Sequence, residues 1–146
     1  MYQRILIPVD GSPTSDRALQ EALGLARQQN AQLKLVHVVV DIRFVDIESY
    51  INYAELQETM RSNGNKVLMQ AQTAVKQAAM TAEVKLLEAG GERVASVIVA
   101  EAERWPADLI IIGTHGRSGF SRLLFGSVAE GVVRTAHIPV LLIRGG

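Results

Sequence analysis

The sequence predicts a single α/β domain, an open sheet of five parallel strands with helices on both faces. Several short segments are dense in branched aliphatic residues on both faces, which is typical of strands buried in a parallel sheet. Segments with the helical period of 3.6 residues lie between them. The 146 residues, 48% of them apolar, suit one domain and contain no linker, so the domain is expected to span residues 1–146.

Five segments are predicted as strands. The third alternates polar and apolar residues and is expected nearer a sheet edge, whereas the other four are apolar on both faces. In chain order the strands cover residues 4–9, 32–40, 82–88, 108–112 and 139–143.

Four helices are predicted between these strands. The first begins with Ser12 as N-cap and Pro13 at the first helical position, and it stops at Asn30. Its apolar face holds Ala18, Leu19, Ala22, Leu23 and Ala26. The second helix presents Val67, Ala71, Ala74, Val75 and Ala78. The third presents Val94, Ala95, Ile98, Val99 and Ala102 and ends before Pro106. The fourth turns Phe125, Val128, Ala129, Val132 and Val133 inward, with Pro139 beyond its end.

The pattern is weakest over residues 41–65. The string RSNGN at residues 61–65 normally breaks a helix. The region is therefore expected to be either a mobile loop or an irregular helical hairpin.

Composition excludes several functional classes. Fifteen basic and fifteen acidic residues balance, so no long-range attraction favours nucleic acid or an anionic membrane. The absence of cysteine excludes disulfides, thiolate metal sites and cysteine nucleophiles. His37, His115 and His137 are scattered and are each expected to be structural rather than metal ligands. No apolar run reaches the length of a membrane span, and the amino terminus lacks a basic lead, so a soluble cytoplasmic protein is expected.

Two loops have chemistry suited to a ligand: DGSPTS after the first strand and GTHGRSG after the fourth. In a doubly wound sheet, ligands bind outside the carboxyl ends of the strands where the strand order reverses. If the first and fourth strands are neighbours, both loops border one crevice.

The string GTHGRSGFSRLLFGS, at residues 113–127, holds four of the twelve glycines. Glycine lets a ligand approach the backbone, and N–H groups at a helix start attract phosphate. Ser127 would add a hydroxyl donor and Arg117 a positive charge, while Asp10 could bind a ribose hydroxyl or a water on phosphate-bound Mg²⁺. The alternative is ordinary loop architecture, with Ser127 capping a helix and Asp10 organising the turn at Gly11. The segment is not a P-loop, because Gly-Lys-Ser/Thr is missing.

Over its full length the chain resembles the universal stress proteins of the UspA superfamily. RILIPVDGSPTSDRAL resembles the family's opening strand and helix, LVHVV its second strand, and residues 107–144 its carboxyl-terminal signature. The pattern Gly-x2-Gly-x9-Gly-Ser/Thr, which marks the ATP-binding branch, is met by Gly113, Gly116, Gly126 and Ser127. Phe120 and Phe125 depart from the residues common in the family, which affects local packing only.

The resemblance implies a Rossmann-like fold, similar to the adenine nucleotide alpha hydrolases, with strand order 3-2-1-4-5. It also implies bound ATP, with Mg²⁺ held through the phosphates. Pro8, Val9 and Asp10 would contact the adenosine end, with Val38 against the adenine. The ribose and phosphates would be lined by Gly113, Thr114, His115, Gly116, Arg117, Gly126, Ser127 and Val128.

The expected function is a nucleotide-dependent regulator without efficient catalysis. Slow ATP hydrolysis or self-phosphorylation is the most that is expected, with Thr114, Ser118, Ser121 and Ser127 as the acceptors to examine. One alternative is a nucleotide-independent dimeric scaffold. Another is an ATP-using transferase or pyrophosphatase, which would need a motif after the first strand that DGSPTSD does not resemble.

The last strand suggests how copies of the chain assemble. IPVLLIRGG is apolar on both faces and is expected at a sheet edge, where an exposed strand invites pairing with another chain. The family commonly forms its dimer there, so a homodimer is expected, with a tetramer as a further option. Residues 41–65 are the candidate for a second contact or for a cover over the nucleotide. The resemblance also implies a protein client, of which membrane transporters are an example.

Overall fold

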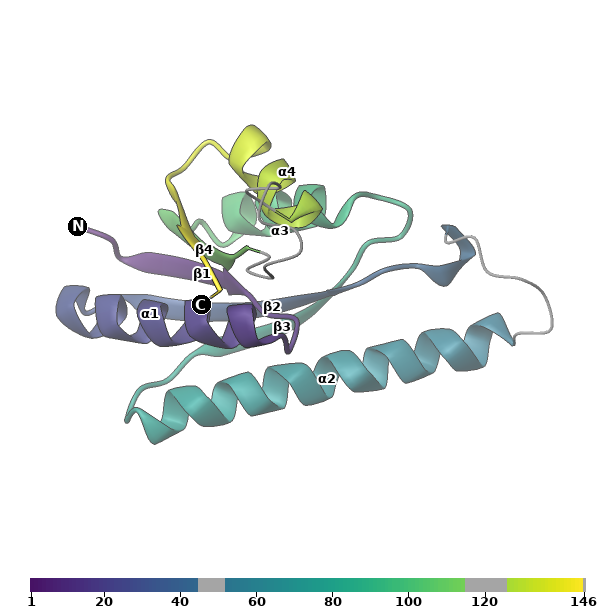
Figure 1. Cartoon of the computed structure of the whole chain (residues 1–146), viewed down its shortest axis with the longest axis horizontal. Helices are drawn as coiled ribbons and strands as arrows, with labels where there is room; N and C mark the ends of the chain where they lie inside the picture. The colour runs from purple at the N-terminus through teal and green to yellow at the C-terminus, as the bar shows by residue number, and fades with distance from the viewer. Residues whose placement is uncertain (45–51, 115–125, 146) are drawn as a thin grey trace.

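The protein is a five-stranded parallel sheet in the order β3-β2-β1-β4-β5. The computed structural model describes residues 1–44, 52–114 and 126–145 (Figure 1). The strands are β1 (Arg4–Pro8), β2 (Gln32–Val39), β3 (Glu83–Glu88), β4 (Leu109–Gly113) and β5 (Val140–Ile143). Both the predicted order and the five strands are confirmed, with every strand boundary within one residue of its prediction.

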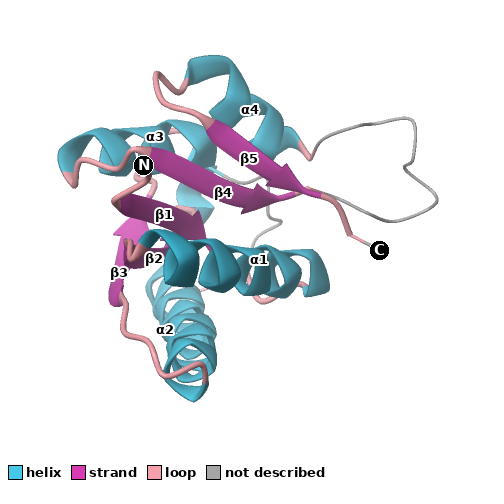
Figure 2. Cartoon of the chain, turned by 90° about the vertical axis from the view of Figure 1, so that its left-hand side faces the viewer, coloured by secondary structure: helices cyan, strands magenta, loops and turns pink. Residues whose placement is uncertain are grey.

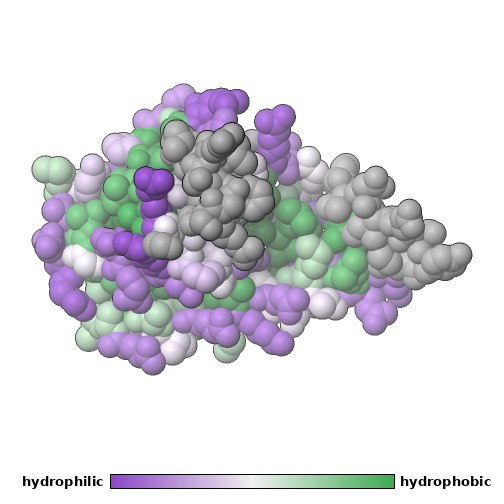
Figure 3. All heavy atoms as spheres, viewed as in Figure 1, coloured by the Kyte–Doolittle hydropathy of each residue, from purple (hydrophilic) through white to green (hydrophobic). Residues whose placement is uncertain are grey.

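Helices cover both faces of the sheet (Figure 2). They are α1 (Pro13–Gln29), α2 (Tyr53–Gln77), α3 (Val94–Arg104) and α4 (Ser127–Thr135), and a short 3₁₀ turn, η1, covers Ile42–Phe44. Successive strand residues point to opposite faces. Ile5 and Ile7 therefore pack with α1 and α2, whereas Leu6 packs with α3 and α4. Figure 3 shows mostly hydrophilic residues along the lower rim of the molecule, over α1 and α2, as expected for helices with one buried side.

The ends of α1 follow the sequence signals. Ser12 precedes the helix in an extended conformation, and its Oγ accepts a hydrogen bond of 3.1 Å from the Ser15 N–H. Pro13 is the first helical residue, and Asn30 ends the helix in the left-handed conformation with φ 53°. The predicted cap, first residue and stop are all confirmed.

Helix α2 is longer than predicted. It starts at Tyr53 and continues without interruption through RSNGN, so the expected loop or irregular hairpin is wrong for residues 53–65. Gly64 is buried, and a Cβ there would lie 2.7 Å from His37 Cδ2 on β2 and 2.8 Å from Leu86 Cδ1 on β3. The glycine thus lets α2 lie close on the sheet, and this contact outweighs the weak helix propensity of the string. Residues 45–51 lie outside the described residues.

One residue predicted to face inward from α4 does not. Ala129 and Val132 are buried, but Val133 is 42% exposed. The buried side of α4 is the one that meets α3, where a Cβ at Gly131 would lie 2.6 Å from the Ala95 Cβ. Among the described residues, no element covers the side of α4 that carries Val133. Phe125 lies outside the described residues.

A buried ion pair fixes α3 to the sheet near the amino ends of the strands. Lys34 Nζ lies 2.7 Å from Glu101 Oε2, and the two side chains are only 6% and 4% exposed. Arg104 and Lys85 also bond to this carboxylate. Burial alone would raise the pKa of Glu101, but the hydrogen bonds from Arg104 and Lys34 outweigh it and lower the pKa to about 2. Glu101 therefore stays ionised and anchors the helix.

Candidate functional site

The two strands that lead into the loops singled out by their chemistry are neighbours in the sheet. Strands β1 and β4 are parallel neighbours, with Ile5 opposite Leu109 and Leu6 opposite Ile110. Their carboxyl ends therefore lie side by side, and the order β2-β1-β4 reverses the direction of chain progression between them. This is the topological position at which open α/β sheets bind ligands. The predicted adjacency of the two strands is confirmed.

The loop after β1 is a tight turn organised by Asp10. Its Oδ1 accepts a hydrogen bond of 2.9 Å from the Ser12 N–H, and its own N–H donates to Ser15 Oγ at 3.1 Å. Gly11 follows with φ +81°, a conformation that favours glycine. The expectation that Asp10 serves the turn is correct. Because the turn engages Oδ1 and the side chain is exposed, the carboxylate remains accessible to a ligand as well.

The three apolar residues assigned to the adenosine end do not share one face. Val38 packs with the cluster of β4, α3 and α4, and Pro8 points to the same side by strand alternation. The Val9 side chain instead joins the α1 and α2 cluster and is 6% exposed. Pro8 and Val38 are therefore placed to contact a base with their side chains, whereas Val9 can do so only through its backbone.

Packing, rather than backbone conformation, requires glycine at position 113. Its φ is not in the positive region. A Cβ there would lie 2.8 Å from the Thr14 carbonyl oxygen and 2.9 Å from the Thr14 carbonyl carbon. The first turn of α1 therefore presses on the end of β4, and glycine is needed for that approach. The start of α1 and the end of β4 are thereby held in contact.

Thr114 is built into the sheet. Its N–H donates to the Ile143 carbonyl at 2.9 Å, its Oγ1 lies 3.5 Å from the same oxygen, and the residue is 3% exposed. A ligand thus meets little of its side chain. The link ties the start of the glycine segment to the end of β5.

Helix α4 begins at an N-cap residue that has no side chain with which to cap the backbone donors. Gly126 is the N-cap, extended at φ −67° and ψ 159°, and Ser127 is the exposed first helical residue. The alternative that Ser127 caps the helix is therefore wrong. Val128 is half-buried against the cluster of β4, α3 and α4. An uncapped helix start with a neighbouring hydroxyl is suited to an anion. His115, Gly116 and Arg117 lie outside the described residues, as do Ser118 and Ser121.

One further residue at this end of the sheet, His37, was expected to be only structural. His37 Nδ1 lies 2.8 Å from the carbonyl oxygen of Val9, the residue that leads into the Asp10 turn. The signal for a more specific role was present in the sequence, because His37 is a polar residue within an otherwise aliphatic strand. Its partner is a backbone atom 28 positions earlier, which no local pattern reveals.

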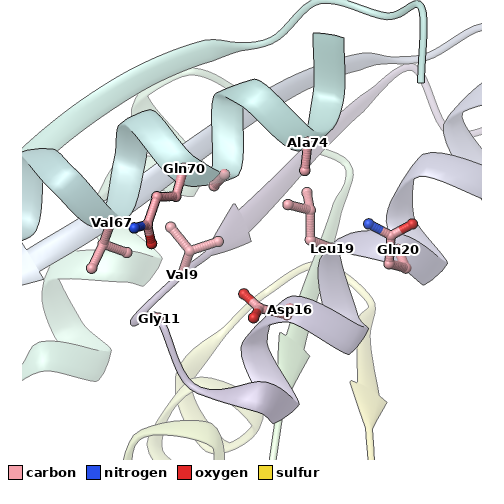
Figure 4. A pocket seen from close by; sticks show the side chains of 9 residues that line it. Val9, Gly11, Asp16, Leu19, Gln20, Val67, Gln70 and Ala74 are labelled. Carbon is pink, nitrogen blue, oxygen red and sulfur yellow. The ribbon is translucent and has the colours of Figure 1, made fainter. Parts of the chain in front are cut away.

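A cavity of about 250 Å³ lies on the other face of the sheet, between α1 and α2 (Figure 4). Its walls combine apolar and polar side chains with one turn glycine. They are Val9, Gly11, Asp16, Leu19, Gln20, Val67, Gln70, Ala71 and Ala74. The cavity is below the usual size of ligand pockets, and of its walls only Val9 and Gly11 belong to the loop after β1. Within residues 1–44, 52–114 and 126–145, no cluster of three acidic or histidine side chains is placed to hold a metal.

Comparison with known proteins agrees with this architecture. The model of the universal stress protein family matches residues 1–144. A universal stress protein of Methanocaldococcus jannaschii is 33% identical over 144 residues, covering 99% of this chain and 83% of that protein. YxiE of Bacillus subtilis is 30% identical over 154 residues, covering 99% of this chain and all of that protein.

Solved structures show the same relationship. A Burkholderia pseudomallei protein of the family superposes with a TM-score of 0.80 at 32% identity, covering 99% of this chain and 97% of that one. A universal stress protein in complex with cAMP gives 0.74 at 25% identity, with 99% of both chains covered. The Archaeoglobus fulgidus protein in complex with dAMP gives 0.69 at 25%, with 98% of both covered. The chain belongs to the universal stress protein family.

Proposed function

We propose that the protein is a cytoplasmic ATP-binding regulator whose nucleotide lies in the crevice between the ends of β1 and β4. The observation that carries this proposal is the pairing of these two strands, which sets the exposed Asp10 turn beside the carboxyl end of β4, the strand that precedes α4 in the chain. A carboxylate on one side and backbone donors on the other suit the two ends of a nucleotide.

Each predicted site residue has a part in this proposal. Pro8, Val9 and Val38 contact the adenosine end, and Asp10 binds the ribose or a water on Mg²⁺ held by the phosphates. Gly113, Thr114 and Val128 shape the crevice, while the N–H groups of Gly126 and Ser127 and the Ser127 hydroxyl meet the phosphates. His115, Gly116 and Arg117 complete the phosphate side.

Two further observations support a nucleotide. Structures of family members with cAMP and with dAMP share this fold over nearly the whole chain. The chain also carries the Gly-x2-Gly-x9-Gly-Ser pattern at residues 113–127. Both adenine nucleotides in those complexes are monophosphates, so the preference of this chain for ATP is a separate point for experiment.

Ser127 offers a test that spares the fold. Proline in its place removes one N–H and the hydroxyl, and it is tolerated at the first position of a helix. Gly126, at φ −67° and ψ 159°, nearly matches Ser12, at φ −75° and ψ 158°, which already precedes a proline in α1. Gly113 is unsuitable for this purpose because any side chain there meets the Thr14 backbone.

The assay is calorimetric titration with ATP and Mg²⁺, with GTP for comparison, after denaturation of a sample to detect nucleotide carried through purification. We expect wild type to bind ATP, Ser127→Ala to bind more weakly, and Ser127→Pro to lose about tenfold or more, since hydrogen bonds to charged groups are strong. The melting temperature of each variant is the control. Equal binding by wild type and Ser127→Pro would show that the phosphates do not contact the start of α4. No binding by nucleotide-free wild type would favour the scaffold alternative.

The second part of the proposal is a homodimer through β5. This strand lies at one edge of the sheet, and its Leu141 is 41% exposed. Val84 on β3, at the other edge, is 40% exposed and provides a matched control. Sedimentation should show a dimer that Leu141→Lys dissociates and Val84→Lys does not, because charge on an edge strand opposes pairing. The reverse pattern would assign the dimer interface to β3. Loss of a tetramer in both variants would assign one interface to each edge of the sheet.

Regulation is proposed to act through a protein client, such as a membrane transporter, that distinguishes loaded from empty protein. Within residues 1–44, 52–114 and 126–145, no helix is long and apolar enough to cross a membrane. Slow hydrolysis or self-phosphorylation would use Ser127 in preference to Thr114, because Ser127 is exposed and Thr114 is buried. Phosphopeptide mapping after incubation with ATP tests that preference.

A further inference from the structure

We propose that His37 is a positioning residue, which holds the Asp10 turn in the orientation that a ribose requires. The inference rests on the proposed nucleotide site and adds a residue that does not itself touch the nucleotide. The relevant contacts lie at the end of β1, where its pairing with β2 stops. The paired residues stop at Pro8 and Val36, and Val9 keeps one further bond, from its N–H to the Val36 carbonyl at 2.8 Å.

The Val9 carbonyl is held by a side chain. His37 Nδ1 lies 2.8 Å from this oxygen. A carbonyl oxygen only accepts hydrogen bonds, so Nδ1 carries the proton and donates. Val9 immediately precedes Asp10, and the bond therefore fixes the peptide plane that leads into the turn.

The imidazole is itself held from behind by α2. The position of a Cβ at Gly64 is 2.7 Å from His37 Cδ2 and 3.2 Å from Nε2, so the far edge of the ring rests against the helix backbone. With α2 on one edge and the Val9 carbonyl on the other, the ring has little freedom to turn. Because glycine alone permits this approach, Gly64 and His37 act as a pair.

The same helix also contacts the turn directly. Val67, one turn after Gly64, lies against Gly11, where a Cβ would be 3.3 Å from Val67 Cγ2. Figure 4 shows Val67 and Val9 lining the same cavity beside Gly11. The Asp10 turn is thus supported by α2 through His37 and Val67 and by α1 through Ser15, while the exposed carboxylate stays available.

Three variants and two ligands test this role. His37→Leu has a methyl group where Nδ1 was, and His37→Asn places an amide N–H at nearly the same point. Binding of ATP and of 2′,3′-dideoxy-ATP, which lacks the ribose hydroxyls, is measured by calorimetry for wild type, both variants and Asp10→Asn. Asp10→Asn keeps the Oδ1 that the turn needs but removes the charge.

We expect wild type to prefer ATP over the dideoxy compound. His37→Leu should lose about three- to tenfold in ATP affinity, the value of one hydrogen bond, with little change for the dideoxy compound. Asp10→Asn should show the same selective loss, and His37→Asn should restore most of the ATP affinity. A merely structural role for His37 would weaken both ligands alike.

The outcomes separate this inference from the proposed function. If wild type binds neither ligand, the proposed nucleotide site is wrong and this inference falls with it. If wild type binds ATP but lacks the preference, or if His37→Leu weakens both ligands equally, only the positioning role is overturned. A long-range ¹H–¹⁵N spectrum of the wild-type imidazole provides a test that needs no variant, because a proton on Nε2 instead of Nδ1 would contradict the donor assignment.

Discussion

Two helical glycines in contrasting surroundings give the sharpest test of how closely α2 lies on the sheet. Among the described residues, a Cβ at Gly24 on α1 meets no atom beyond its own helix backbone within 4 Å, whereas a Cβ at Gly64 on α2 meets His37 and Leu86 at 2.7 and 2.8 Å. Both glycines lie inside helices, so replacement by alanine brings the same gain in helix propensity, about 1 kcal/mol. The difference between the two variants therefore isolates the packing.

For Gly24→Ala the propensity gain stands alone, and we expect the free energy of unfolding to rise by about 0.5–1 kcal/mol. For Gly64→Ala the new methyl group overlaps an imidazole held by its bond to Val9, and overpacking of this kind costs about 1–3 kcal/mol. The net effect should be a loss of about 1 kcal/mol. The two variants should thus differ by roughly 2 kcal/mol with opposite signs.

Urea unfolding followed by circular dichroism measures both values, and the slopes should match that of wild type. In thermal melts the two variants should lie about 4–8 °C apart, since 1 kcal/mol corresponds to about 2–4 °C for a domain of this size. Equal stabilisation by both alanines would refute the close approach of α2, and the continuous helix through RSNGN would then need another explanation.

Further predictions concern the buried ion pair and the glycine at the end of β4. Glu101→Gln should lower the free energy of unfolding by about 3 kcal/mol, because it leaves the buried Lys34 with only the exposed Glu83, 3.6 Å away, as a charge partner. Glu103→Gln, on the exposed side of α3, should change it by less than about 0.5 kcal/mol in chemical denaturation. The pKa of Glu101 is lowered from 4.5 to about 2, so its contribution to the free energy of unfolding is complete above pH 4.5 and is lost as the pH falls toward 2. The stability of Glu101→Gln should therefore fall less steeply than that of wild type over that range. Parallel curves of stability against pH for the two proteins would contradict the pairing. Gly113→Ala should cost more than about 2 kcal/mol, because its Cβ meets Thr14 backbone atoms that cannot rotate away, and a variant as stable as wild type in a thermal melt would show that the contact is looser.

Much of the fold was predictable because its signals are local. Strand positions follow from aliphatic runs, and α1 follows from Ser12, Pro13 and Asn30, whose effects act within one helical turn. The position of the candidate site was also predictable, since parallel strands end at a common edge. The pairing of β1 with β4 confirmed the strand order on which the expected crevice depends.

The roles of individual residues in the site were less accessible. Val9 was grouped with Pro8 and Val38, but strand alternation sends its side chain to the other face. Ser127 was weighed as a cap, but helix α4 starts one residue earlier than a cap at that position requires. The helical spacing alone predicted that Val133 faces inward, but spacing does not show which sides of a helix have neighbours, and Val133 is exposed.

The sequence by itself determined the order of elements, their approximate bounds and the family, because periodicity, capping and motif spacing are written along the chain. Only the tertiary structure decided why particular residues are needed. Gly64 lets α2 rest on His37, Gly113 makes room for the Thr14 backbone, and Glu101 on α3 pairs with Lys34 on β2. In each case the partner is distant in sequence, and the energy depends on a separation of a few ångströms that exists only once helices and strands have packed.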